Sequence, residues 1–193
     1  ELGELGKRFI KNNKPSLEAQ IANIADEIAY NNHDIDDGLR ANLLNINLLS
    51  KSVLFEDNLK EVVKKWKTLN ERQIRHEVVR RMINYIVSDL IENSRRLIQS
   101  YQPGNVDAVR ESRQSLIKMG EFIEKKHNDL KRILRKELYE HEQVQLMTEQ
   151  AKKTIQHLFD AYMKNPILLT DELQERIKEN IKSKNERKKA RMI

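Results

Sequence analysis

The sequence predicts an all-α protein built as a multi-helix bundle. Residues that interrupt helices are scarce, with 5 glycines and 3 prolines among 193 residues. Charged residues make up 34% of the chain and apolar residues 38%. Apolar side chains recur at steps of three and four along several segments, which is the spacing of one face of an α-helix. These observations together favour amphipathic helices that each bury one face.

The first long helix is expected from Ser16 to about Arg40. Ser16 follows Pro15, and its hydroxyl can accept from the backbone N–H groups of the first turn, so it is the expected N-cap. The apolar residues of this helix fall on one side and are expected to face the core: Leu17, Ile21, Ile24, Ile28, Ile35 and Leu39.

The opposite face of this helix carries the most unusual pattern in the chain. Asp26, Tyr30 and Asp34 stand four residues apart, so they lie along one side. Residues 16–39 contain several acids but no Lys or Arg, and like charges at this spacing destabilise a helix. A cation, a hydrogen-bonding ligand or a basic partner would relieve that cost. The residues alone fit either a binding site or an acidic surface exposed to solvent.

The remaining elements follow from the same periodicity. A short apolar element is expected at 41–49, and further helices are expected over 53–67, 69–100, 121–138, 142–164 and 170–181. The helix over 69–100 has a clear packing face, made of Val78, Met82, Ile86, Leu90 and Leu97. The turn at 101–105 contains Pro and Gly and ends that helix. Residues 1–193 are expected to form a single helical region, in which this turn could mark a subdomain edge.

The net charge of +6 allows contacts with polyanions. Arg72 and Arg75 share a face near the start of the helix over 69–100. They fit a phosphate clamp, because a planar guanidinium group matches phosphate oxygens, and they equally fit a solvated basic surface. The tail at 184–191 carries five basic residues and one acid, which fits nucleic-acid binding or a solvated helix start.

Several classes of chemistry are excluded or disfavoured. The absence of cysteine rules out disulfides and thiolate nucleophiles and fits a reducing cytoplasm. No apolar run approaches the roughly 18 residues of a membrane span. The sequence contains no Gly-rich phosphate loop, nucleophile elbow or zinc-protease motif. His33 and Asp34 make a poor metal pair, because neighbours on a helix point about 100° apart. Asp26 stays a candidate for a hard divalent cation, but one carboxylate cannot hold a metal alone.

The chain resembles a known family at specific residues. Those residues are Ser16-Leu-Glu-Ala-Gln, Ala25-Asp-Glu-Ile-Ala-Tyr30 and His33-Asp-Ile-Asp-Asp-Gly-Leu-Arg40. They look like the hallmark segment of the bacterial deoxyguanosinetriphosphate triphosphohydrolase-like proteins, which belong to the HD-domain superfamily. The similarity continues in Leu138-Tyr-Glu-His141, in Leu158-Phe-Asp-Ala-Tyr162 and in Asn165-Pro166.

The resemblance implies part of an HD-domain-like helical bundle that hydrolyses a deoxynucleoside triphosphate to a deoxynucleoside and triphosphate. In that family a His, a His-Asp pair and a later Asp hold one divalent metal, such as Mg or Mn. Asp26 matches the last of these ligands, and Tyr30 and Asp34 match positions that line the deoxynucleotide pocket near the sugar. Arg72 and Arg75 are the expected triphosphate contacts, and no residue is assigned a catalytic role. The resemblance also implies a cytoplasmic homo-oligomer.

One departure from the family is large. The other metal ligands should precede Asp26, yet no His occurs before His33. The chain therefore resembles the C-terminal portion of such an enzyme and is expected to be inactive on its own. The alternative hypothesis is a non-catalytic helical module that binds single-stranded nucleic acid or a partner protein through its basic faces.

Overall fold

The computed structural model describes residues 13–180 together with residues 3, 6 and 10. Most of the predicted N-terminal loop and the whole basic tail at 184–191 lie outside the described residues. The chain divides into two compact units, Glu1–Tyr139 and Glu140–Ile193. The turn at 101–105 lies inside the first unit. The two units meet between Tyr139 and Glu140 instead.

The prediction of an all-α fold is confirmed, because every regular element in the described part of the chain is helical. The first unit contains α2 (Leu17–Arg40), α3 (Ile46–Leu49), α4 (Val53–Lys65), α5 (Glu71–Tyr101), α6 (Val106–Arg110), α7 (Glu121–Leu134) and the π-helical segment η1 (Arg135–Tyr139). The second unit contains α8 (Glu142–Lys164), the 3₁₀ turn η2 (Pro166–Leu168) and α9 (Asp171–Asn180).

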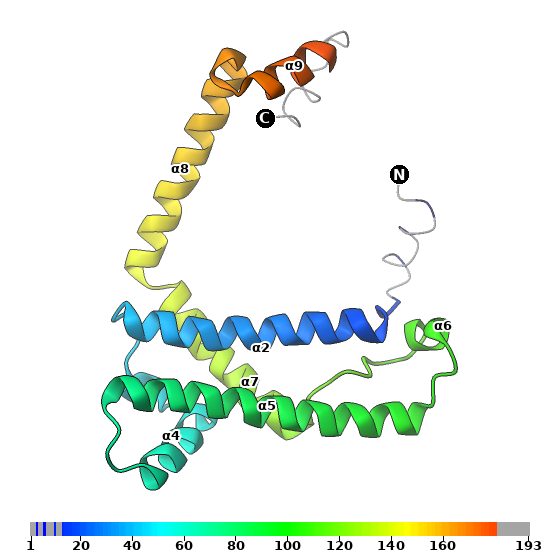
Figure 1. Cartoon of the computed structure of the whole chain (residues 1–193), viewed down its shortest axis with the longest axis vertical. Helices are drawn as coiled ribbons and strands as arrows, with labels where there is room; N and C mark the ends of the chain where they lie inside the picture. Colours follow the sequence, from blue (N-terminus) through cyan, green and yellow to red (C-terminus); the bar gives the residue numbers. More distant parts are fainter. Residues whose placement is uncertain (1–2, 4–5, 7–9, 11–12, 181–193) are drawn as a thin grey trace. The chain divides into compact units, whose positions relative to one another are not determined.

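The long helices α2 and α5 form the frame of the first unit. They lie alongside each other and run in opposite directions (Figure 1). Ser16 caps α2 as predicted, since its Oγ accepts from the backbone N–H of Ala19. Asn70 and Gln73 form a reciprocal capping box that starts α5. Sequence signals that act over one turn therefore set both starting points.

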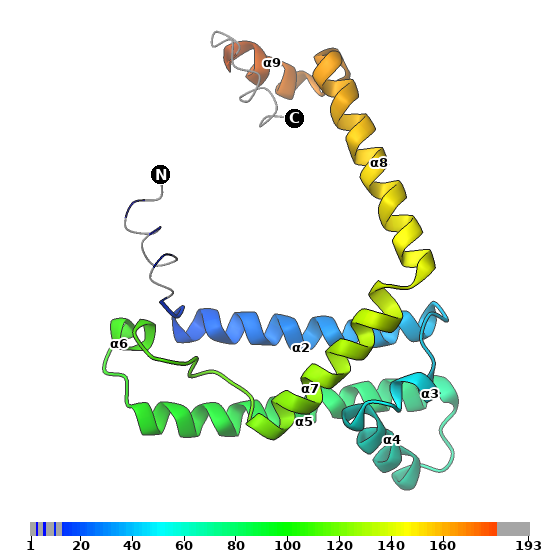
Figure 2. The same cartoon turned by 180° about the vertical axis from the view of Figure 1, so that it is seen from behind.

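The core lies where α4 and α7 pack against this pair of helices. Figure 2 shows α7 crossing α2 and α5. The predicted face of α5 is confirmed for Val78, Met82, Ile86 and Leu90, which are buried, while Leu97 is only half-buried. They join apolar residues of the other helices in one cluster, which includes Ile28, Ile35, Leu49, Phe55, Val62, Ile123, Leu130 and Leu134.

The predicted core face of α2 is wrong at Ile21, whereas Leu17 is half-buried and Ile24 packs against the core. Ile21 is 51% exposed, whereas the neighbouring polar residue Gln20 is 4% exposed. Gln20 is buried because its amide bonds to three backbone groups. Its Nε2 donates to the carbonyl of Pro15 at 2.9 Å, and its Oε1 accepts from the N–H groups of Leu116 at 2.8 Å and Ile117 at 3.1 Å. Gln20 takes the inward position at this turn, and Ile21, about 100° further round the helix, lies outside the core.

The described part of the second unit consists of the long helix α8, followed by η2 and the short helix α9. α8 ends at Lys164 as predicted, where Asn165-Pro166 follows and η2 begins. Gln174 ties α9 to η2, because its Nε2 donates to the carbonyls of Ile167 at 3.1 Å and Leu169 at 2.8 Å. None of the described α8 residues is buried, so the apolar residues expected to pack there are not enclosed within this unit. Among the described residues, no helix is both long enough and apolar enough to cross a membrane.

Candidate functional site

A pocket of about 820 Å³ lies between α2 and the segment formed by α7 and η1. We call it the α2–α7 pocket, and every residue that lines it belongs to the first unit. Its lining comprises Asn23, Asp26, Glu27, Tyr30 and Asn31 from α2, with Asn128, Lys131, Arg132, Arg135 and Tyr139 from α7 and η1. Carboxylates, cations and phenol groups thus share one cavity of a size suited to a small ligand.

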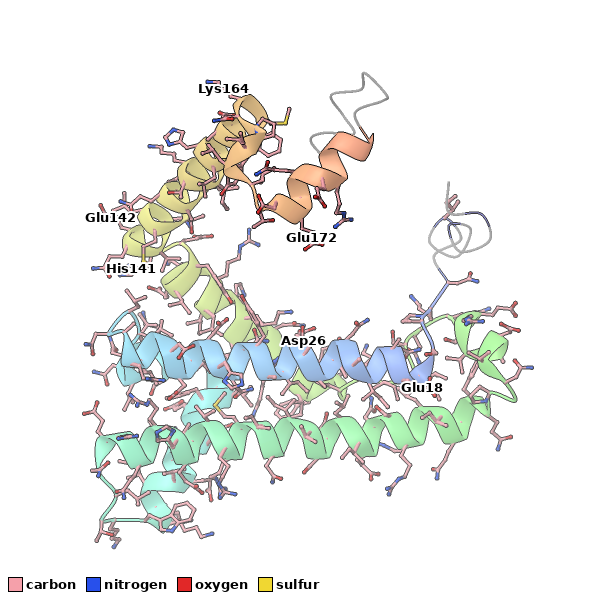
Figure 3. All side chains as sticks on the ribbon, turned by 45° about the horizontal axis from the view of Figure 1, so that its top comes forward. Glu18, Asp26, His141, Glu142, Lys164 and Glu172 are labelled. Carbon is pink, nitrogen blue, oxygen red and sulfur yellow. The ribbon has the colours of Figure 1, made fainter. Side chains whose placement is uncertain are left out.

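The carboxylate side of the pocket is formed by α2. Asp26 is exposed, and Figure 3 labels it along α2, beyond Glu18 at the helix start. Tyr30 stands one turn further on and is 57% exposed. The i,i+4 spacing puts both side chains on one face of α2, as predicted, and both line the pocket.

Asp34 joins this group through a residue of η1. The hydroxyl of Tyr139 donates to Oδ2 of Asp34. Burial raises the pKa of Asp34 above its ordinary value, and the hydrogen bond from Tyr139 opposes that rise. Burial also raises the pKa of Tyr139, and its bonds to Asp34 and Tyr30 act in the same direction. Tyr139 consequently connects Asp34 with Tyr30, and its raised pKa keeps its hydroxyl protonated.

The basic side of the pocket is formed by α7 and η1. Lys131 and Arg135 are one turn apart, and Arg132 lies between them, paired with Asp129 of its own helix. Nζ of Lys131 donates to Oε1 of Glu27 at 2.6 Å, so α2 and α7 are joined across the pocket wall. The helix widens to a π-helical turn at Arg135–Tyr139, a rare geometry that often marks functional positions.

A buried histidine supports this wall from behind. His127 is 2% exposed, and its Nε2 lies 3.1 Å from Nδ2 of Asn31. An amide nitrogen can only donate, so His127 Nε2 accepts and the ring proton lies on Nδ1. Nδ1 lies 3.7 Å from Oε1 of Glu27. Burial lowers the pKa of His127, the charge of Glu27 opposes that shift, and the charge of Lys131 reinforces it. His127 is thus a neutral packing residue that links two pocket residues.

The structure separates Arg72 and Arg75 from the α2–α7 pocket. Nε of Arg75 lies 3.0 Å from Oδ1 of Asp36, and this ion pair joins α5 to α2. Arg72 is exposed at the start of α5. Neither residue lines the pocket around Asp26 and Tyr30. A role for either in holding a triphosphate stays a prediction.

The cations that do line the pocket were not anticipated. A signal was present in the sequence, because Lys131, Arg135 and Tyr139 recur every four residues. Tyr139 also falls in the matched segment Leu138-Tyr-Glu-His141. The spacing alone could not show that this face of α7 meets the acidic face of α2.

The metal implied by the resemblance does not fit the described residues by themselves. Among the side chains that the structure describes, which end at residue 176, no three of His, Asp or Glu come close enough to hold a metal ion. Glu27, the carboxylate next to Asp26, is engaged by Lys131. Asp26 can supply one oxygen ligand, and the rest would have to come from residues outside this described set.

Comparisons with known proteins find the same group of proteins that the resemblance names. Residues 117–193 match the family described as the phosphohydrolase-associated domain. The chain is 43% identical over 178 residues to a deoxyguanosinetriphosphate triphosphohydrolase-like protein of Nitrosomonas europaea, covering 92% of this chain and 47% of the relative. A protein of the same description from Thiobacillus denitrificans is 42% identical over 176 residues, covering 91% and 46%. A third, from Bordetella pertussis, is 38% identical over 169 residues, covering 88% and 44%.

The resemblance to these triphosphohydrolase-like proteins and to the HD-domain superfamily is therefore confirmed. The similarity extends over about nine tenths of this chain, so it includes α2 with Asp26, Tyr30 and Asp34. The chain spans about half the length of the curated relatives it matches.

Proposed function

We propose that this chain, as a relative of the deoxyguanosinetriphosphate triphosphohydrolase-like proteins, forms the nucleotide-binding wall of an enzyme that hydrolyses deoxynucleoside triphosphates. The products would be a deoxynucleoside and inorganic triphosphate. One observation carries the proposal. Asp26 and Tyr30 of α2 share a single pocket with Lys131, Arg135 and Tyr139, and Tyr139 donates to Asp34.

The pocket offers separate contacts for the parts of a nucleotide. Lys131 and Arg135 provide positive charge for the triphosphate, and cations aimed at phosphate oxygens stabilise the charge that develops there. Tyr30 and the Asp34–Tyr139 pair provide donors, an acceptor and aromatic surface for the sugar and base. Glu27 holds Lys131 in position through the 2.6 Å contact.

A divalent metal such as Mg or Mn is part of the proposal for the intact protein. Asp26 would contribute one ligand, because hard cations prefer carboxylate oxygen. The described residues do not complete a metal site. We therefore assign Asp26 a binding role only and derive no chemical step from the metal.

The central test compares Asp26→Ala with the wild type in the intact protein. Triphosphate release from dGTP and the other deoxynucleoside triphosphates would be measured by ion-exchange chromatography with Mg or Mn present. The proposal expects release from the wild type and its loss from Asp26→Ala. Asp107→Asn is the control, because Asp107 is an exposed residue of α6 outside the pocket. Undiminished release from Asp26→Ala, or none from the intact wild type, contradicts the proposal.

A second test addresses the basic side of the pocket. Lys131→Ala removes a charge-assisted contact worth about 1.5–3 kcal/mol, which corresponds to roughly a 10- to 100-fold weaker interaction with nucleotide. We expect this loss mainly in KM if Lys131 holds the triphosphate in the ground state. Lys125→Ala is the matched control, because Lys125 is exposed on the same helix and does not line the pocket. Equal effects of the two substitutions on KM would show that Lys131 does not contact the nucleotide.

The proposal also expects a homo-oligomer in the cytoplasm, since soluble enzymes commonly form symmetric assemblies. Light scattering of the intact protein at several concentrations would measure its mass. A monomer at all concentrations would contradict this part of the proposal without affecting the pocket.

A further inference from the structure

A second polar cavity of the first unit borders the contact between Glu27 and Lys131. Its volume is about 490 Å³, and all its lining residues belong to that unit. We call it the loop cavity, because the segment between α6 and α7 supplies Arg113, Ser115 and Lys118 to its lining. None of these three residues lines the α2–α7 pocket. The loop cavity is therefore a separate space, and the function proposed above makes no use of it.

The loop segment is held in place by hydrogen bonds to its backbone. The side chains that make them come from α2 and α5: Gln20, Asp89, Asn93 and Ser94. The backbone N–H of Lys118 donates to Oγ of Ser94 at 3.0 Å, and its carbonyl accepts from Nδ2 of Asn93 at 2.9 Å. Lys14 is fixed as well, since its backbone N–H donates to the carbonyl of Arg110 at 2.9 Å. Groups that are fixed before binding reduce the entropy that is lost when a ligand binds.

Two carboxylates of the loop cavity are already paired with lysines. Oε2 of Glu124 lies 3.1 Å from Nζ of Lys118, and Oε1 of Glu27 lies 2.6 Å from Nζ of Lys131. The buried ring of His127 also lines the cavity, and its lowered pKa keeps it uncharged at neutral pH. These five side chains together contribute no net charge.

The remaining charged side chains of the loop cavity are both cations. Lys14 and Arg113 line it, and neither forms an ion pair with a carboxylate within the described part of the chain. They give the cavity a surplus of two positive charges. The hydroxyl of Ser115 and the amides of Gln114 and Asn128 add groups that can donate hydrogen bonds. The lining is thus suited to a small anion with several acceptor oxygens.

A phosphate dianion matches this arrangement in charge and in geometry. Its two negative charges equal the surplus, and the planar guanidinium of Arg113 can bond two of its oxygens at once. The volume of the cavity suits a small molecule. We propose that the loop cavity binds a phosphate dianion, either inorganic phosphate or the phosphate group of a small monoester, with Lys14 and Arg113 as its charged contacts. The proposal rests on this cavity and not on the hydrolysis of a nucleotide.

Isothermal titration calorimetry of the intact protein tests the proposal, without added metal or nucleotide and at constant ionic strength. The probes are inorganic phosphate and glycerol 3-phosphate, and we expect dissociation constants in the millimolar range or below. Arg113→Gln should weaken binding about tenfold or more, because it removes a charge-assisted contact. Arg96→Gln is the matched control, since Arg96 is exposed on α5 and does not line the cavity. Arg113→Lys keeps the charge and should recover part of the lost affinity.

A second pair of variants tests the other cation. Lys14→Gln should weaken binding of both probes to a similar extent. Lys125→Gln should leave it unchanged, because Lys125 is exposed on α7 outside the cavity. Circular dichroism will verify that every variant keeps the helical content of the wild type. Affinities that are the same for each variant and its control would overturn the proposal.

Two further measurements locate the anion and define its charge. Arg135→Gln should leave binding unchanged, because Arg135 lines the α2–α7 pocket and not the loop cavity. A loss as large as that of Arg113→Gln would place the phosphate elsewhere and overturn the proposal. Acetate, a monoanion, should bind at least tenfold more weakly, and equal affinity for acetate would contradict recognition of a dianion. Absence of binding of both probes at millimolar concentration would overturn the proposal as well.

The relative affinities of the two probes identify the source of the phosphate. Tighter binding of glycerol 3-phosphate, lost in Arg113→Gln, supports the proposal and assigns the cavity to a phosphomonoester. Tighter binding of inorganic phosphate with the same loss supports it and assigns the cavity to the free ion. Triphosphate release by the intact protein is measured separately, so failure of the proposed function leaves this result unaffected.

Discussion

Replacing Gln20 by Ala is expected to destabilise the first unit by about 2–4 kcal/mol. The Gln20 amide is buried and bonds to Pro15 on one side and to Leu116 and Ile117 on the other. The substitution leaves two backbone N–H groups without their acceptor, and one of them belongs to the buried residue Leu116. Each such loss costs about 1–3 kcal/mol, and water can reach the half-buried Ile117 more easily.

Urea unfolding provides the measurement, with Trp66 as the reporter. Trp66 is the single tryptophan of the chain and packs against the core of the first unit, so its fluorescence follows that unit. The unfolding midpoint should fall while the m value stays the same, since the surface exposed on unfolding hardly changes. Gln99→Ala is the control, because Gln99 is exposed on α5. A loss below about 0.5 kcal/mol, or one equal to that of Gln99→Ala, would refute the buried hydrogen-bond argument.

Three further predictions concern the same unit. Gly38→Ala should lower the free energy of unfolding by about 1–3 kcal/mol, because a Cβ there would lie 2.5 Å from Cδ1 of the buried Leu44. This loss should outweigh the better helix propensity of Ala. Unchanged or higher stability in urea would contradict the prediction. Burial holds the pKa of His127 in the folded chain below its ordinary value of about 6.5, so the unfolded chain takes up the proton first as pH falls through 6.5. Stability in urea should therefore be full above pH 6.5 and decline below it, and His127→Gln should reduce that decline. Tyr139→Phe should raise the pKa of Asp34 further by removing a bond to its charged form, and an NMR titration that shows a fall would disprove this.

The charge arrangement explains why α2 tolerates its acidic face. Glu27 is paired with Lys131, Asp36 with Arg75, and Asp34 accepts from Tyr139. Each partner comes from another element of the first unit, so the tertiary structure relieves part of the repulsion that the isolated helix would suffer. Asp26 keeps its exposed position in the pocket. A binding site on this face of α2 stays a prediction.

The sequence by itself determined the helices and the line of side chains along α2. Ser16, Asn70 and Asn165-Pro166 act within one turn of the chain, so their effects could be predicted without knowledge of the fold. The four-residue spacing of Asp26 and Tyr30 fixes their shared face in any helix. Periodicity failed for Ile21, because hydrophobicity suggested burial and the bonds of its neighbour decided otherwise.

The tertiary structure alone decided which residues meet. Lys131 bonds to Glu27 across 104 positions of sequence, and Tyr139 bonds to Asp34 across 105. Helical periodicity describes each face separately and contains no information about the crossing of α7 over α2. Because of that crossing, Lys131 and Arg135 line the pocket. Arg75 does not line it and forms an ion pair with Asp36 instead. The reason is physical: local hydrogen bonds and spacing form a helix, but long-range packing determines its neighbours.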